Sequence, residues 1–413
     1  MSFFKRDDFE VIEVSDKHIR LRTVLFVMAF VIAVGSIGFG VSRIGHKDPG
    51  FYVISPSADE EALLYHNGVT FSYFCEGSSG DIKAQIRELT EIYSGSLQRA
   101  YKLLDAEQTY LGLVNLASVN ESLGQDISLP EALYDVLLDA WEKTLEEQGY
   151  NMFAGALLRE WEEIRMLTEP EAYDPVNDPD MGERIRKLRE ATADLSHFDV
   201  KVVNREEHIL RITVDQDYLA LLKALEYEGP VLDLGQLHDA YEMEYVKRDL
   251  EASGFTKGTL LTDSGLTVNL SGQDQGDFAL YSLEKDSGAV VLKDRIKAGN
   301  GSVLSFFRCF AMDREGQKEP GYYAFRAKDG SMVWRYENMP LMAEDPGKIQ
   351  ASWCVGYMSA TGADPLLSDS TDSGRITDCV YANIRLWSAE DPSAVAAEYR
   401  ADPVLRWDGR QDG

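Results

Sequence analysis

The segment Val231–Tyr245 carries the residues best suited to chemistry. A short apolar run ends in Asp233 and Gly235, and an amphipathic stretch follows directly. Where a strand ends in an acidic residue and a glycine turn, the free N–H groups of the next helix can hold a phosphate, and the carboxylate can hold a metal ion. An ordinary strand-to-helix turn, with Asp233 as a capping residue, has the same local pattern. The motifs in the rest of the chain are needed to decide between a ligand-binding turn and an ordinary capping turn.

Helices and strands are predicted on both sides of this segment. Within it we predict a strand to Asp233, a helix that stops at Gly254 and a further strand over 258–263. Other predicted helices cover about 81–104, 131–145, 152–167, a polar stretch up to 195, 217–227, 376–387 and 393–399. Short β runs are predicted at 208–214, 278–283, 289–292, 303–310, 322–327, 333–336 and 352–357. The mixture predicts an α+β fold in a single compact domain.

Local patterns add detail to this outline. The Asn-Gly pair at 67–68, between two alternating runs, predicts a β-hairpin over 62–74. Ser128 and Glu131 have the spacing of a capping box. The acidic, proline-containing stretch 168–180 is typical of a solvated loop and lacks the twelve-residue EF-hand pattern. The helix that follows the capping box is expected to bury Leu133, Leu137, Trp141 and Leu145.

The N-terminal region has the properties of a membrane anchor. Residues 24–41 form a run without charge, which as a helix would cover roughly 27 Å, close to the thickness of a bilayer's hydrocarbon core. More basic residues precede the run than follow it, which places the N-terminus in the cytoplasm. We therefore predict a cytoplasmic tail (1–23), a transmembrane signal anchor (24–43) and an extracytoplasmic domain (48–405) of a single-pass cell-membrane protein. A cleaved signal peptide is the alternative, but no A-x-A-like site follows the run.

Composition excludes several classes of partner and enzyme. The net charge of −29 makes nucleic acid and anionic headgroups unfavourable partners. No H-E-x-x-H, G-x-S-x-G or P-loop motif is present, so metalloprotease, hydrolase and kinase functions lack a motif. The four cysteines, Cys75, Cys309, Cys354 and Cys379, have no C-x-x-C spacing, and both disulfides and free buried thiols stay open.

Seven segments in order, over about residues 65–400, resemble the motifs of the FAD:protein FMN transferases (ApbE-type flavin transferases). The family element D-x-G-G-x-x-K-G-Y-x-x-D aligns without gaps to 233–244 and matches at Asp233, Gly235 and Tyr241. The N-x-G-G strand is similar to 262–265, and the metal-binding D-x-x-x-T pair falls on 378–382. The residues that match in the other boxes include Asn120, Gly155, Leu157, Trp161, Gly265, Arg308 and Asp378.

The resemblance implies an exported or membrane-anchored flavin-transferase-like domain. Members of this family use Mg²⁺ and FAD, as substrate, to place FMN on a threonine of a redox protein, so the implied partner is a membrane redox protein that accepts FMN. By resemblance, the cofactor-binding residues would be Asp233, Gly235, Tyr241, Gly265 and Arg308, and the metal ligand would be Asp378. No catalytic residue is assigned.

Several positions depart from the family pattern. Asp239 stands where the family has a lysine, and at roughly 4 Å an unpaired like charge beside a phosphate costs on the order of 4 kcal/mol at an effective dielectric of ~20. Ala382 replaces the metal-binding threonine and offers no oxygen. Tyr323 replaces the histidine favoured as a base, and a phenol that titrates near pH ~10 is a poor base at neutrality.

Three functions remain open at this point. The first is a Mg²⁺-dependent FMN transferase. The second is a non-catalytic descendant (a pseudoenzyme) that holds a ligand or partner on the same fold without these cofactors, which the clustered substitutions favour. The third is a structural or adhesive envelope protein that acts through its acidic surface.

Overall fold

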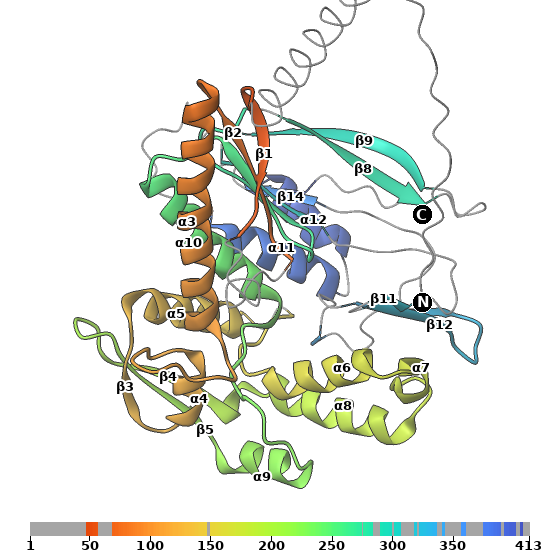
Figure 1. Ribbon diagram of the computed structural model, residues 1–413. Helices are drawn as coiled ribbons and strands as arrows, with labels where there is room; N and C mark the ends of the chain where they lie inside the picture. The colour runs from red at the N-terminus through yellow and green to blue at the C-terminus, as the bar shows by residue number, and fades with distance from the viewer. Residues whose placement is uncertain are drawn as a thin grey trace, which may run out of the picture. The chain divides into compact units, whose positions relative to one another are not determined.

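The structure is a computed structural model, and it describes the chain in several stretches (Figure 1). These stretches are residues 47–56, 68–146, 149–274, 276–283, 290–299, 301–306, 318–319, 322–336, 341–342, 357–360, 375–389, 392–401 and 405–407. The predicted tail and anchor, most of the first strand of the predicted hairpin, and Arg308 lie outside the described residues. Within the described stretches, no helix has both the length and the apolar character needed to cross a membrane.

The described residues form two units by their internal contacts. The smaller contains residues 47–50 and 76–84, and with them the first turns of helix α3 (Ser79–Leu104). There the Asp81 carboxylate accepts hydrogen bonds from the backbone N–H and the hydroxyl of Ser78, at 2.9 and 2.7 Å. These two bonds fix the turn at which the helix begins.

The larger unit is built around a seven-stranded sheet with the order β1-β2-β6-β7-β10-β14-β15 (Figure 1). Its strands are β1 (Gly50–Ile54), β2 (Thr70–Cys75), β6 (Gly258–Leu261), β7 (Leu266–Asn269), β10 (Val303–Phe306), β14 (Tyr357–Ala360) and β15 (Leu405–Trp407). From β2 to β15 every neighbouring pair is antiparallel. An antiparallel sheet with separate helices is the arrangement expected of an α+β protein. The prediction of one domain that mixes helices and strands is therefore confirmed.

Three smaller sheets complete the β structure. A sheet of order β3-β5-β4 lies among the helices at the lower end of Figure 1, β8 and β9 form a hairpin, and β11, β12 and β13 form the third sheet. Their bounds are β3 (Asp126–Ser128), β4 (Phe198–Asn204), β5 (Ile209–Val214), β8 (Gly276–Leu283), β9 (Val290–Ala298), β11 (Lys318–Glu319), β12 (Tyr322–Arg326) and β13 (Met332–Tyr336). Strands β1, β3, β4, β7, β11 and β15 were not predicted.

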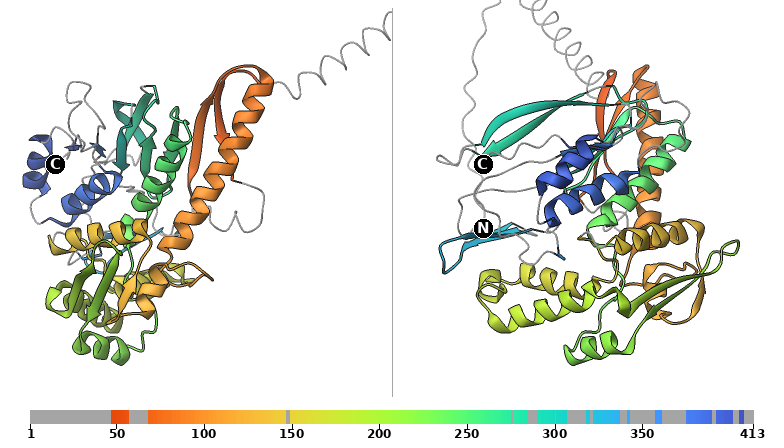
Figure 2. Two further views of the ribbon diagram at one scale, coloured as in Figure 1. Left: turned by 90° about the vertical axis from the view of Figure 1, so that its left-hand side faces the viewer. Right: turned by 180° about the vertical axis from the view of Figure 1, so that it is seen from behind.

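The helices supply most of the buried apolar side chains. Besides α3, they are α4 (Leu116–Glu121), α5 (Glu131–Leu145), α6 (Gly155–Met166), α7 (Pro170–Tyr173), α8 (Pro179–Ala193), α9 (Gln216–Ala224), α10 (His238–Ala252), α11 (Ile376–Ser388) and α12 (Pro392–Ala401). Helix α11 packs against β10 and β14 and contacts both α10 and α12 (Figure 2, right). The helices predicted at 81–104, 131–145 and 376–387 are thus confirmed.

Several local predictions are wrong. The residue at the N-terminus of α5 is Pro130, without a side-chain cap, because Ser128 is the last residue of β3 and pairs with Ile209. In the stretch predicted as a solvated loop, residues 170–173 form α7, and Asp174 is fully buried. The carboxylate of Asp174 receives bonds from the buried guanidinium of Arg335 (2.7 and 3.1 Å) and the phenol of Tyr323 (2.8 Å), which compensates its burial.

Residues 231–234 are not a strand, because other groups take their backbone hydrogen bonds. The Asn120 side chain accepts from the N–H groups of Val231 (3.1 Å) and Leu232 (2.8 Å) and donates to the Leu232 carbonyl (3.0 Å). The N–H of Asp233 donates to Met152 (2.9 Å), and the Val231 carbonyl accepts from Gly155 (3.2 Å). This clamp brings together three separate stretches of the chain and positions Asp233.

A glycine is required at position 155 by the same clamp. A Cβ on residue 155 would lie 2.3 Å from the carbonyl oxygen of Pro230 and 2.9 Å from that of Val231, both of them backbone atoms. Helix α6 therefore begins at the only kind of residue that permits this approach.

Replacing Asn120 tests the clamp. Asn120→Ala leaves two buried N–H groups without a partner and should lower the free energy of unfolding by about 2–3 kcal/mol. The matched control is Asn204→Ala, in an exposed turn, which should stay within about 0.5 kcal/mol. The measurement is urea denaturation of the full-length chain in mild detergent, and equal losses in the two variants would contradict the clamp.

Candidate functional site

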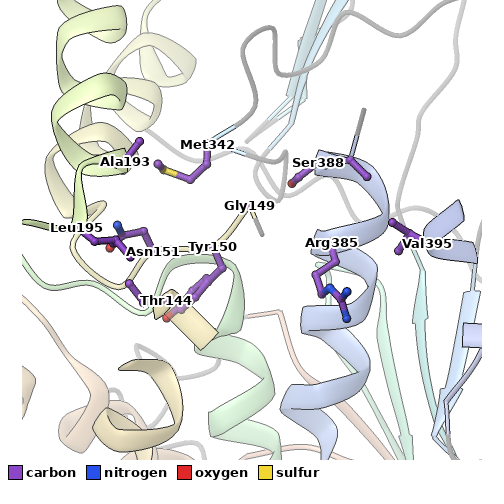
Figure 3. Close-up of a pocket in the computed structure, with 11 residues that line it drawn as sticks. Thr144, Gly149, Tyr150, Asn151, Ala193, Leu195, Met342, Arg385, Ser388 and Val395 are labelled. Atoms are coloured by element: carbon purple, nitrogen blue, oxygen red, sulfur yellow. The ribbon is translucent and has the colours of Figure 1, made fainter. Parts of the chain in front are cut away.

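Two cavities lie next to the clamped segment, together with a small gap of about 10 Å³. One, of about 440 Å³, is lined by Gly68, Leu158, Glu162, Asp233, Gly235, Gln236, His238, Asp239, Asp263 and Ser264, and is called the acidic cavity below. The other, of about 520 Å³, is shown in Figure 3 and is called the α11 cavity. The gap shares lining residues with both cavities, and the predicted residues Asp233 and Gly235 line the gap and the acidic cavity.

The acidic cavity has a charge unsuited to a pyrophosphate. Four carboxylates line it, those of Glu162, Asp233, Asp239 and Asp263, against the single imidazole of His238. A concave surface whose side chains carry one sign of charge concentrates ions of the opposite sign and repels ions of the same sign. The cavity therefore favours cations.

Asp233 makes the turn that begins α10. Its carboxylate accepts a 2.7 Å bond from the N–H of Gly235, and Gly235 has φ +50°, in the left-handed region that glycine adopts without strain. Burial raises the pKa of Asp233, and the Gly235 N–H opposes that rise. The structure places these two residues in a cap-like turn on the cavity wall, and their role in cofactor binding stays a prediction.

His238, Asp239 and Glu242 cluster in the first turns of α10. Burial alone would lower the pKa of His238, but the carboxylates of Asp239 (3.7 Å away), Glu242 and Asp233 outweigh it and raise that pKa to about 9. Burial raises the pKa of Glu242 to about 7, against the opposing charge of His238. The lysine-to-aspartate departure at position 239 thus places a carboxylate that pairs with His238.

A second group, the Asp139 network, joins α5, α10 and α11. One Asp139 oxygen accepts from Lys143 and from Arg375, both at 2.8 Å, and the other accepts a 2.6 Å bond from the Tyr241 phenol. The Lys143 ammonium also donates to Asp378 at 2.9 Å. Burial would lower the pKa of Lys143, yet the carboxylates of Asp139 and Asp378 raise it, so the ammonium stays charged at neutral pH.

Glu244 lies at the edge of this network. Its carboxylate accepts from the backbone N–H (3.2 Å) and hydroxyl (3.3 Å) of Thr377 and lies 3.5 Å from Arg375. Two cations therefore stand among three carboxylates, so one negative charge is left in excess.

The predicted metal site does not fit Mg²⁺. Asp378 is engaged by an ammonium at 2.9 Å, and Ala382, one turn further along α11, is buried and has no side-chain oxygen. Mg²⁺ demands near-octahedral oxygen ligation, whereas this position already holds a protein cation. A bound Mg²⁺ would have to share Asp378 with the Lys143 ammonium, a like charge that already bonds one of its oxygens.

The other predicted residues lie apart from one another. Tyr241 is buried within the Asp139 network, and Gly265 forms the β6–β7 turn with φ +93°. Tyr323, at the position of the family's histidine, is buried on Asp174 and has its pKa raised by burial, so it is not placed as a base. Of the cofactor-binding set, the described residues bring only Asp233 and Gly235 to a cavity wall.

Sequence reasoning missed Asp139 and Lys143. Both are buried, whereas Leu145, expected in the buried stripe of α5, is 51% exposed. The signal available was the i,i+4 spacing of an acid and a base on one helix, which is also typical of an exposed surface pair. Nothing local distinguishes the buried case.

The α11 cavity differs in character from its neighbour. Figure 3 shows Arg385, Ser388 and Val395, from α11 and α12, on one side and Tyr150 and Asn151 on the other. Three polar atoms of its lining residues, Tyr150 Oη, Arg385 Nε and Ser388 Oγ, are buried without a hydrogen-bond partner among the described residues. All three can donate, and each is shielded from solvent, so none is exposed on the cavity wall in this structure.

Comparison with known proteins gives a partial structural likeness. No family model matches the chain, and no curated protein matches it. Among solved structures, the chain is similar to the flavin transferase ApbE from Vibrio cholerae (12% identity, TM-score 0.46, covering 83% of this chain and 93% of that one). It is also similar to the apo flavinyl transferase ApbE from Pseudomonas stutzeri (12%, 0.48, 88% and 95%). At these values the likeness does not establish a family, and the chemistry has to be argued from this chain's own residues.

Replacing Lys143 tests the Asp139 network. Lys143→Met leaves Asp139 with Arg375 and Tyr241 but removes one buried cation, and it should lower the free energy of unfolding by about 2–3 kcal/mol. The control, Arg186→Met, removes an arginine that pairs with two exposed glutamates and should cost less than about 1 kcal/mol. Urea denaturation measures both, and a Lys143→Met loss as small as the control's would show that the network does not stabilise the fold.

Proposed function

We propose that this chain is a non-catalytic ligand-binding protein on a flavin-transferase-like fold. It does not carry out Mg²⁺-dependent transfer of FMN from FAD. The observation that carries the proposal is the Lys143 ammonium, 2.9 Å from the one residue that the resemblance assigns to the metal. An enzyme that relied on that metal would need this carboxylate free for it.

The two cavities support the same proposal. Transfer of a phosphoryl-linked group needs positive charge at the pyrophosphate. The wall beside Asp233 instead carries four carboxylates and one imidazole. The α11 cavity, which is lined by Arg385 and by no carboxylate among its lining residues, is the part better suited to holding an acceptor-rich ligand. Binding without transfer agrees with both observations.

The proposal places the domain outside the cell membrane, tethered by residues 24–43. Its support is the charge-free run and the excess of basic residues before it. Removal of residues 1–46 should release the protein from washed membranes into the soluble fraction. Retention of the shortened chain in carbonate-washed membranes would refute the tether.

A flavin titration tests the loss of transfer chemistry. The full-length chain in detergent is titrated with FAD, followed by flavin fluorescence, with and without Mg²⁺, and AMP is then assayed. We expect no effect of Mg²⁺ on FAD affinity and no AMP above the protein-free background, because Lys143 holds the metal position. Magnesium-dependent binding accompanied by AMP release would restore the transferase function.

A further inference from the structure

A group of side chains separate from the Asp139 network has the composition of a metal site. His238, Asp239 and Glu242 each offer one ligand atom, and these atoms lie within 4.8 Å of one another. His238 and Glu242 are four residues apart on α10 and so share one face of the helix, one turn apart. Asp239 lies beside them, three residues before Glu242, on the same side.

Glu242 indicates that something is bound there. Its side chain is fully buried, and neither carboxylate oxygen has a hydrogen-bond partner among the described residues. Of the acidic residues that the structure describes as buried, the other three have basic partners: Asp139 has Lys143, Asp174 has Arg335, and Glu160 has Arg184. A buried carboxylate without such a partner is strongly unfavourable unless a cation compensates it.

The ligand set selects the kind of cation. One imidazole nitrogen with two carboxylates suits a borderline divalent transition metal such as Zn²⁺, whereas Mg²⁺ and Ca²⁺ prefer oxygen ligands throughout. His238 and Asp239 also line the acidic cavity, which provides a route of entry and leaves a coordination position open to solvent. The carboxylates of Asp233 and Asp263 on the same wall concentrate cations at that entrance.

We propose that His238, Asp239 and Glu242 bind one divalent transition-metal ion, with Zn²⁺ as the preferred probe. The site uses no residue of the Asp139 network and goes beyond the proposed function, on which it does not depend. It accounts for the two carboxylate oxygens of Glu242, which accept no hydrogen bond among the described residues.

The test is calorimetric titration of the chelator-treated, full-length chain with Zn²⁺ and, separately, with Mg²⁺. We expect one equivalent of Zn²⁺ to bind far more tightly than Mg²⁺ and to raise the melting temperature. His238→Asn and Glu242→Gln should each weaken Zn²⁺ binding by on the order of 100-fold. The matched control is His197→Asn, because His197 also lies beside carboxylates, those of Asp194 and Asp215, and its loss should leave Zn²⁺ binding unchanged.

A melting measurement separates a ligand from a structural residue. Without metal, Glu242→Gln should melt no lower than the wild type, since the amide removes a buried charge, and with Zn²⁺ it should melt lower. Folding of each variant is checked by circular dichroism, and Asp239→Asn replaces any variant that fails to fold. Absence of stoichiometric Zn²⁺ binding, equal affinity for Mg²⁺, or unchanged Zn²⁺ binding in the variants would overturn the proposal.

Discussion

The position of one ammonium group determines how the central helices of this protein meet. Lys143 projects from α5 between Asp139 on its own helix and Asp378 at the start of α11, with distances of 2.8 and 2.9 Å. Tyr241 of α10 bonds the same Asp139. Three helices from distant parts of the chain are therefore joined through one buried carboxylate. Such a carboxylate is tolerated in the interior only because cations and donors satisfy it.

The same interaction bears on the chemistry that the sequence motifs imply. At the position that the resemblance assigns to a metal ion, the cation is the ammonium of a side chain. Here the lysine needs no bound metal to balance Asp378, and Ala382 could not complete a ligand set. The two cavities differ in the groups that line them. Carboxylates line the acidic cavity, and residues with hydrogen-bond donors line the α11 cavity. The chemistry proposed for this chain therefore rests on its own residues.

Much of the secondary structure could be predicted because its signals are local. The long helix α3 follows from apolar residues at helical spacing, and β12 and β13 follow from short β-branched and aromatic runs. The strand predicted at 231–233 does not form. The backbone N–H groups of Val231 and Leu232 instead donate to the side chain of Asn120, more than a hundred positions away. No pattern within that segment records such a partner.

The site was predictable only in part, for the same reason. Asp233 and Gly235 were found from the turn that they form, and they do line the cavities. The pairing of Asp139 with Arg375 and that of Asp174 with Arg335 span 236 and 161 positions, and each partner taken alone has the composition of a surface residue. Whether a charged residue is buried is decided by tertiary packing, which a single sequence does not show.

The central claim is that Lys143 occupies the cation position beside Asp378, and anomalous diffraction from Mn²⁺-soaked crystals tests it most directly. The wild type and Lys143→Met are soaked under identical conditions and compared at the midpoint between Asp139 and Asp378. The account predicts no manganese peak there in the wild type and a peak in Lys143→Met, where Asp378 loses its ammonium partner and Asp139 keeps only Arg375 and Tyr241. A manganese peak at that point in the wild type would contradict the account.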